Sequence, residues 1–100
     1  MWAWNVGVPL ETVRFAAANR LCIDLGYQGS VRRVEPYSLR RTKDDHLLLY
    51  AVRRDNREPR SYRVDRIQSV RVTTEPFKPI YAVEFWPSGV INAPPVRRQP

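Results

Sequence analysis

Residues 46–74 read HLLLYAVRRDNREPRSYRVDRIQSVRVTT and contain three strand-like runs. The first run, 46–52, is almost entirely apolar, and such a run predicts a central strand with both faces covered. The other two, 60–64 and 68–74, alternate between polar and apolar side chains, as strands with one buried face do. Because polar turns separate the runs, this half of the chain predicts short antiparallel strands.

The turns between these runs also have predicted roles. Asp55-Asn56 forms the turn of a charged loop between the first two strands. Asp65-Arg66-Ile67 interrupts the chain before the third, and we expect Asp65 to bond the backbone of that turn while Ile67 fills the core. In the third run Val70 and Val72 share one face.

The N-terminal half adds one helix and more strands. In residues 10–20 apolar side chains recur at spacings of three and four, which predicts a short helix with Phe15 off its apolar stripe. Residues 21–25 alternate like a strand and lead into a glycine-containing turn. Within 31–41, Pro36 predicts the start of a strand or an edge strand, because proline has no N–H to donate to a ladder.

The whole pattern predicts a mainly β fold, a small five-stranded antiparallel barrel with one N-terminal α-helix. Residues 80–86 predict the last strand. We expect a lead segment at 1–9, one domain at 10–86, and a flexible tail rich in proline and arginine at 87–100.

The composition excludes several classes of protein. Hydrophobic residues make up 43% and charged residues 27%, as in globular domains, and no apolar run approaches the ~20 residues of a membrane-spanning helix. The N-terminus is a poor signal peptide, and the single cysteine, Cys22, lies in an apolar run; together they predict a buried thiol in a cytoplasmic protein. His46 is the only histidine, and neither a phosphate loop nor a nucleophile elbow is present, so we expect no metal, no cofactor, no catalytic residue and no enzyme activity.

The charge distribution points to an anionic partner. The net charge is +7, and 15 of the 17 basic residues are arginine, which suits planar, bidentate contact with phosphate. Residues 32–71 contain 12 basic and 6 acidic residues, so most of the net charge lies on the predicted strands. Arginine doublets at 32–33, 40–41 and 53–54 each place one cation on either face of a strand, and together they predict a basic stripe. The alternative is a solvated arginine-rich surface without a partner.

Three stretches of this sequence resemble the WYL domain family. They are residues 34–39 with the Glu35-Pro36 element, the apolar run 47–52, and the element Arg60-Ser61-Tyr62-Arg63-Val64-Asp65-Arg66-Ile67 with the residues that follow it. Leu47-Leu48-Leu49, or His46-Leu47-Leu48 with a shift, stands where the family has its Trp-Tyr-Leu triplet. The resemblance spans roughly residues 11 to 78. It implies an Sm-like, SH3-type barrel with a preceding helix, as found in bacterial transcription regulators and defence-associated proteins.

The resemblance also implies a regulatory domain that binds a ligand, often nucleic acid or a nucleotide, in an arginine-lined site. A winged helix-turn-helix usually accompanies this domain, and these 100 residues have no room for one. We therefore expect one of three partners: a DNA-binding regulator, a helix-turn-helix region of the same protein, or a second copy of this chain.

Arginines and tyrosines interleave on the predicted strands, a combination that clamps phosphates and stacks on bases. Arg60 and Tyr62 share one face of their strand, Arg63 lies on the other, and Arg66 follows in the break. The candidate residues for binding a ligand or nucleic acid are Arg60, Arg63, Arg66, Arg53, Tyr50, Tyr62 and Tyr27.

Each candidate also has a purely structural interpretation. In that interpretation Arg60 pairs with Glu35 or Asp55, and the tyrosines fill the core or pack across strands. The sequence alone leaves both interpretations open.

Two functions follow from these observations. The first is a ligand-sensing domain in transcriptional or defence-related regulation, which holds single-stranded nucleic acid or a nucleotide through arginine and tyrosine. The alternative is a protein-interaction or oligomerisation module of a bacterial regulator, without a ligand of its own. Binding that weakens steeply with salt favours the first, because neutralising phosphates releases counterions.

Overall fold

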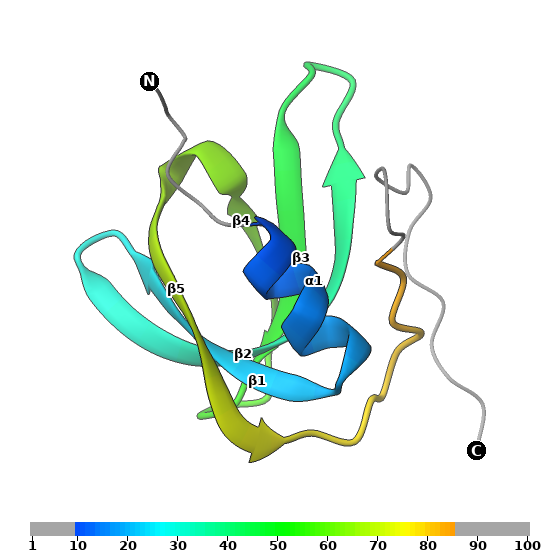
Figure 1. The fold of residues 1–100 in the computed structure, drawn as a ribbon. Coiled ribbons are helices and arrows are strands. Elements are labelled where there is room, and N and C mark those ends of the chain that lie inside the picture. The colour runs from blue at the N-terminus through cyan, green and yellow to red at the C-terminus, as the bar shows by residue number, and fades with distance from the viewer. Residues whose placement is uncertain (1–9, 86–100) are drawn as a thin grey trace.

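One five-stranded antiparallel sheet with a helix beside it makes up residues 10–85, the part of the chain that this computed structural model describes (Figure 1). The elements in chain order are α1 (Leu10–Ala18), β1 (Leu21–Tyr27), β2 (Ser30–Arg41), β3 (Leu47–Arg53), β4 (Pro59–Arg63), the 3₁₀ helix η1 (Val64–Arg66) and β5 (Ile67–Pro76). The predicted lead segment 1–9 and tail 87–100 lie outside the described residues.

The strand order is β4-β3-β2-β1-β5, and neighbouring strands are antiparallel. This confirms the mainly β class, the five strands and the single helix before them. No pairing joins β4 to β5 within the described residues, so the sheet is not closed, and the Sm-like or SH3-type barrel stays a prediction.

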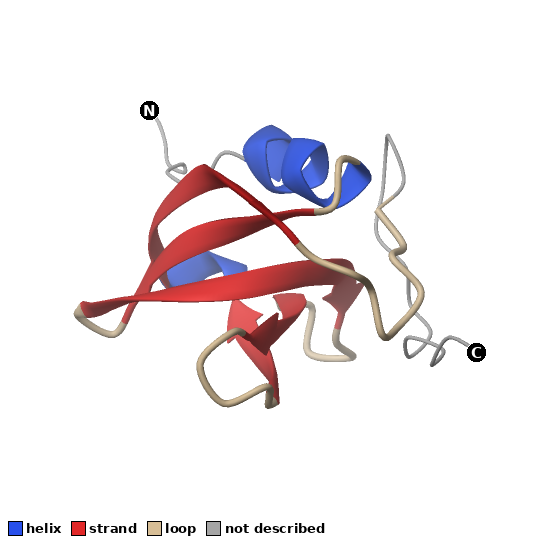
Figure 2. Ribbon diagram, turned by 90° about the horizontal axis from the view of Figure 1, so that it is seen from below, coloured by secondary structure: helices blue, strands red, loops and turns tan. Residues whose placement is uncertain are grey.

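The helix α1 lies against one face of the curled sheet (Figure 2). Its Phe15 is 56% exposed, off the apolar stripe as predicted. The helix ends at Ala18 because Arg20 adopts a left-handed backbone, with φ at 57°, and its guanidinium donates to the Ala17 carbonyl oxygen at 2.7 Å. The side chains that α1 buries are Val13, Ala16 and Ala17.

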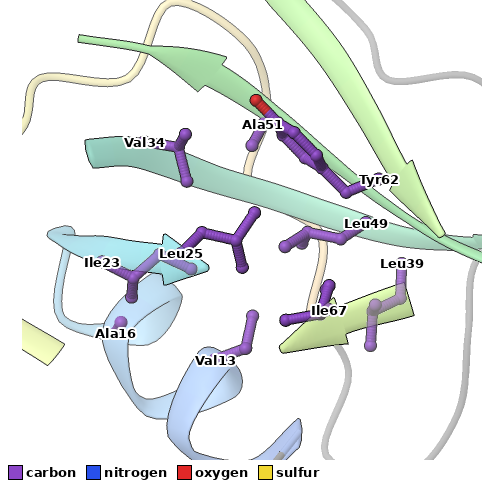
Figure 3. Close-up of a cluster of buried hydrophobic side chains, with 10 residues drawn as sticks. All are labelled: Val13, Ala16, Ile23, Leu25, Val34, Leu39, Leu49, Ala51, Tyr62 and Ile67. Atoms are coloured by element: carbon purple, nitrogen blue, oxygen red, sulfur yellow. The ribbon is translucent and has the colours of Figure 1, made fainter. Parts of the chain in front are cut away.

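The sheet face toward α1, called the inner face below, carries the main core (Figure 3). Register pairs such as Ile23 with Val34 and Leu39 with Leu49 put apolar side chains on this face. Val70 and Val72 of β5 pack against the same cluster, which confirms that they share a face. The cluster comprises Val13, Ala16, Ile23, Leu25, Val34, Leu39, Leu49, Ala51, Tyr62 and Ile67.

The opposite face, called the outer face, carries a second and smaller cluster of Cys22, Tyr37, Val52 and Phe77. Cys22 is fully buried, which confirms the predicted buried thiol, and this burial raises its pKa to about 11. Residues 77–85 run back over this cluster along the β2–β3 side of the sheet (Figure 1).

The predicted last strand, 80–86, is wrong for its described part. Residues 80–85 belong to no strand, and Glu84 makes only an isolated parallel bridge with Ser38. The Glu84 N–H donates to the Tyr37 carbonyl oxygen at 2.8 Å. This segment therefore packs on the sheet as a strap rather than extending it.

The predicted strand start or edge strand at Pro36 is also wrong, because β2 runs through it as a single 12-residue strand with neighbours on both sides. Pro36 pairs with Ala51, a register shift follows before Ser38, and the ladder to β1 stops at Val34. A residue without an N–H is tolerated here because the ladder is interrupted on both sides of it. As a result β2 is the central strand, and the apolar run 46–52 forms β3, one position nearer the edge.

Two valines of β2 allow a matched test of this core. Val34 is fully buried on the inner face, whereas Val31 is 69% exposed. We expect Val34→Ala to lower the free energy of unfolding by about 2 kcal/mol, since it removes buried methyl groups and leaves a cavity. Val31→Ala should change it by less than about 0.5 kcal/mol. Urea unfolding of both variants measures this, and equal effects would contradict the assigned faces.

Candidate anion-binding site

Strand register brings three arginines to one end of the inner face. Arg32, Arg53 and Arg60 come from three neighbouring strands, β2, β3 and β4. Each pairs across the sheet with a residue of the inner core, and these partners are Leu25, Val34 and Ala51. Directly paired residues project from the same face, so the three side chains share the inner face. We call them the inner arginine cluster.

Tyr62 lies beside this cluster in the core. It is 3% exposed, and its ring packs edge-on against Tyr27 with 5.0 Å between centroids. Figure 3 shows its hydroxyl oxygen pointing toward Ala51, at the end of the core where Val34 also lies. That oxygen is buried and makes no hydrogen bond of ordinary geometry with the described residues.

The pKa of Tyr62 reflects this position. Burial raises it above the ordinary tyrosine range, and the charges of Arg32, Arg53 and Arg60, together with a hydrogen-bonding contact from Arg32, oppose that rise. Arginine can only donate hydrogen bonds, so none of these three accepts the hydroxyl proton. The site therefore presents a neutral, unused donor surrounded by positive charge.

Arg32 is the most firmly held member of the cluster. Its Nη2 donates to the Tyr27 carbonyl oxygen at 2.7 Å and also bonds the Ser30 hydroxyl. Its guanidinium carbon lies 5.9 Å from the centroid of the Tyr27 ring. Its Nε is buried and makes no hydrogen bond of ordinary geometry with residues 10–85.

Arg53 and Arg60 pair instead with exposed carboxylates. Arg53 Nη2 lies 2.6 Å from Asp55 Oδ2, and Arg60 Nη2 lies 2.6 Å from Glu58 Oε1. The alternative in which Arg60 pairs with Glu35 or Asp55 is therefore wrong. Exposed ion pairs of this kind contribute about 0–1 kcal/mol, so a stronger anion can replace Asp55 and Glu58 at small cost.

The other sequence candidates lie elsewhere. Arg63 pairs with Leu48, and Tyr50 with Ser61, so both candidates project from the outer face. This confirms that Arg60 and Arg63 occupy opposite faces of β4. The Tyr27 hydroxyl accepts a hydrogen bond from the Arg63 N–H at 3.3 Å, which ties β1 to β4 across the inner face.

The break after β4 behaves partly as predicted. Ile67 is 8% exposed and belongs to the core, as expected. Asp65 does not bond the turn backbone; its Oδ2 instead accepts from Arg63 Nη2 at 2.7 Å. Arg66 is exposed and makes no hydrogen bond or ion pair with any residue from 10 to 85.

Other arginines join an ion-pair network on the outer face, and part of it comes from the loop after β3. Glu35 is fully buried and accepts hydrogen bonds from Arg54 at 2.6 Å, from Arg57, and from the Tyr37 hydroxyl at 2.8 Å. Arg54 also reaches Glu75 at 2.7 Å. These arginines therefore neutralise a fully buried carboxylate, which a buried charge requires.

A second branch of this network centres on Arg33. It binds Glu75 at 2.9 Å and Asp24 at 2.8 Å, and Arg71 also contacts Asp24. The doublets therefore split between faces as predicted, with Arg32 and Arg53 inward and their neighbours outward. Of the predicted basic stripe, the outward members Arg33 and Arg54 are paired with acidic residues, whereas Arg32 and Arg53 align on the inner face.

No group of three or more potential metal ligands occurs among residues 10–85. No helix in that range is long and apolar enough to cross a membrane.

Comparison with known proteins gives one match. The family model described as WYL domain matches residues 9–72, which is well over half of the chain. Neither the curated proteins nor the solved structures contain a match to this chain.

The network on the outer face generates a stability prediction. Glu35→Gln removes the buried charge that Arg54 and Arg57 share, so we expect the free energy of unfolding to fall by about 2 kcal/mol. The matched control is Glu58→Gln, which breaks an exposed pair and should cost less than about 0.5 kcal/mol. Chemical unfolding of both variants measures this. A Glu35→Gln variant as stable as the control would contradict the structural role of the network.

The same network predicts a dependence of stability on pH. Hydrogen bonds from Arg33, and then from Arg71, hold the pKa of Asp24 below its ordinary value. The unfolded state therefore binds the proton first, and the free energy of unfolding should fall as the pH drops from about 4. Asp24→Asn should make this loss shallower, whereas Asp44→Asn, in an exposed turn, should not. Unfolding curves between neutral and acid pH test this, and identical acid slopes for both variants would refute it.

Proposed function

Because the chain belongs to the WYL domain family, we propose that it is a regulatory ligand-sensing domain whose inner arginine cluster binds an anion. The ligand we propose is single-stranded nucleic acid or a nucleotide. The observation that carries this proposal is that Arg32, Arg53 and Arg60 share one face beside the buried Tyr62 hydroxyl, whose proton has no acceptor among residues 10–85. An unsatisfied buried donor costs about 1–3 kcal/mol, and a phosphate oxygen would satisfy it.

The four side chains would make different contacts with the ligand. The Tyr62 hydroxyl and Arg32 Nε offer donors that the fold already holds in place. Arg53 and Arg60 would exchange their exposed carboxylates for phosphate, to which arginine donates two parallel hydrogen bonds. Tyr62 is too buried to stack on a base, so we assign it a hydrogen-bonding role.

The outward candidates would extend the contact surface for a longer ligand. Arg66 is exposed directly after β4, and Arg63 and Tyr50 lie on the outer face. The pairings leave β4 at the edge of the sheet, so a polymer that meets the inner cluster can continue around this strand. Tyr27 supports the site because its ring packs against the Arg32 guanidinium.

Ligand binding would act on a partner that reads DNA. We propose that occupancy of the inner arginine cluster changes how this domain contacts a DNA-binding regulator, a helix-turn-helix region of the same protein, or a second copy. The setting we propose is transcriptional or defence-related regulation in the bacterial cytoplasm, and the role is binding rather than catalysis.

A protein-interaction or oligomerisation module is the second candidate. The free edge of β4 and two exposed apolar side chains, Phe15 and Val31, favour it. This candidate predicts association that depends on protein concentration and changes little with salt.

Binding of a single-stranded oligonucleotide across a salt series tests the first candidate. Each phosphate contact should contribute about −0.7 to the slope of log K against log salt. The double variant Arg32→Ala/Arg60→Ala should therefore bind more weakly and lower the magnitude of the slope by about 1.4.

The matched control is Arg41→Ala/Lys43→Ala, which removes the same charge from exposed positions around the 42–45 turn. It should leave the slope unchanged. Equal losses of affinity in the two double variants would show that binding depends on net charge alone and would contradict the proposed site. A wild-type chain that fails to bind at low salt would overturn the proposal.

A further inference from the structure

A pocket of about 380 Å³ opens on the outer face beside the edge strand β4. Its volume lies in the range of small-molecule sites. Exposed residues of β4 form its rim, and buried side chains form its depth. The residues that matter here are Tyr37, Tyr50, Tyr81, Val52, Pro59 and Ser61. Ala51 and Arg60 also line the pocket. Because Arg60 belongs to the inner arginine cluster, the pocket adjoins that cluster at β4.

Strand register gives the pocket two parallel walls. Tyr50 pairs with Ser61, and two residues along the strands Val52 pairs with Pro59. Ala51 and Arg60 form the pair between them. Their side chains point to the inner face, so their backbone forms the floor of the pocket. Walls two residues apart are separated by about 7 Å. This spacing admits one planar ring at van der Waals distance from both walls.

Two tyrosines form a rigid end to this slot. Tyr37 and Tyr81 pack edge to face, with centroids 5.5 Å apart and ring planes at 90°. The Tyr37 hydroxyl donates to Glu35 at 2.8 Å and accepts from the Ile80 N–H at 3.1 Å, which fixes the ring. Tyr81 lies beyond residues 9–72, so this end of the pocket is outside the part that matches the family.

The charges around the pocket select among aromatic ligands. The guanidinium carbon of Arg40 lies 5.8 Å from the centroid of the Tyr50 ring. Arg40 is 4% exposed, has Glu84 as its carboxylate partner at 2.9 Å, and keeps two buried nitrogens unpaired. This cation behind Tyr50 disfavours a cationic ligand, which would otherwise suit an aromatic site. A neutral, planar heterocycle fits both the spacing and the charge.

We propose that this pocket binds the nucleobase of a nucleoside. The proposal deepens the proposed function and rests on it where the base belongs to a bound strand. In β4, Arg60 projects inward and its neighbour Ser61 projects outward. A strand that crosses this edge would place one phosphate at the inner arginine cluster and the next base in the pocket. The free backbone groups of β4 and the Ser61 hydroxyl would meet the edge of that base.

Nuclear magnetic resonance titration of the 100-residue chain with adenosine tests the pocket without a phosphate. We expect adenosine to shift amide signals of β3 and β4 around Ser61. Ser61→Trp fills the slot with an indole and should weaken adenosine binding about tenfold or more, in line with the free energy that stacking of one base contributes. Tyr81→Ala removes the end wall and should weaken it as well. Thr74→Trp, at an exposed position of β5, is the matched control and should have no effect.

A parallel titration with a single-stranded oligonucleotide separates the two proposals. Arg32→Ala should weaken oligonucleotide binding and leave adenosine binding unchanged. Adenosine that causes no shifts, or shifts that survive both pocket variants, would overturn the pocket while leaving the inner cluster to stand on the oligonucleotide data. Oligonucleotide binding that ignores Arg32→Ala would instead overturn the proposed function. Tighter binding of tryptophan amide than of adenosine at these amides would assign the slot to a protein side chain and overturn the nucleobase proposal.

Discussion

The buried carboxylate of Glu35 is the interaction on which both faces of the sheet depend. It is fully buried and is neutralised by Arg54 and Arg57, while the Tyr37 hydroxyl donates to it. A buried charge is tolerated only with such partners. Arg53 ends β3 and pairs with Val34 on the inner face, while Arg54 follows in the turn and binds Glu35. The same carboxylate fixes Tyr37 at the end of the outer pocket.

The division of charge between the faces follows from this pairing. Acidic residues on the outer face hold the outward arginines in a network whose members neutralise one another. The inner face carries a cluster whose carboxylate partners among residues 10–85, Asp55 and Glu58, are exposed and replaceable. An arginine-rich chain thus separates its structural cations from those available to an anion. The proposed base pocket uses the edge strand β4, where the neighbouring residues Arg60 and Ser61 point to opposite faces.

Strand periodicity predicted much of this from the sequence. It assigned Arg60 and Tyr62 to one face and Arg63 to the other, because side chains alternate between the two faces along any strand. It did not identify Arg32 as a site residue, because the register that aligns this strand with its neighbours depends on the fold. The continuity of β2 through Pro36 was equally hidden, since the bulge that permits it involves β3. The acidic partners that neutralise individual arginines were not predictable for the same reason.

The central claim is that inner arginines bind anions while outer arginines stay in their network. Arginine Nε–Hε signals report each guanidinium separately during titration with a short single-stranded oligonucleotide. The account predicts that the largest shifts belong to Arg32, Arg53 and Arg60. Comparable or larger shifts at Arg33, Arg54 and Arg57 would contradict it, because the ligand would then be breaking the network instead of occupying the inner arginine cluster.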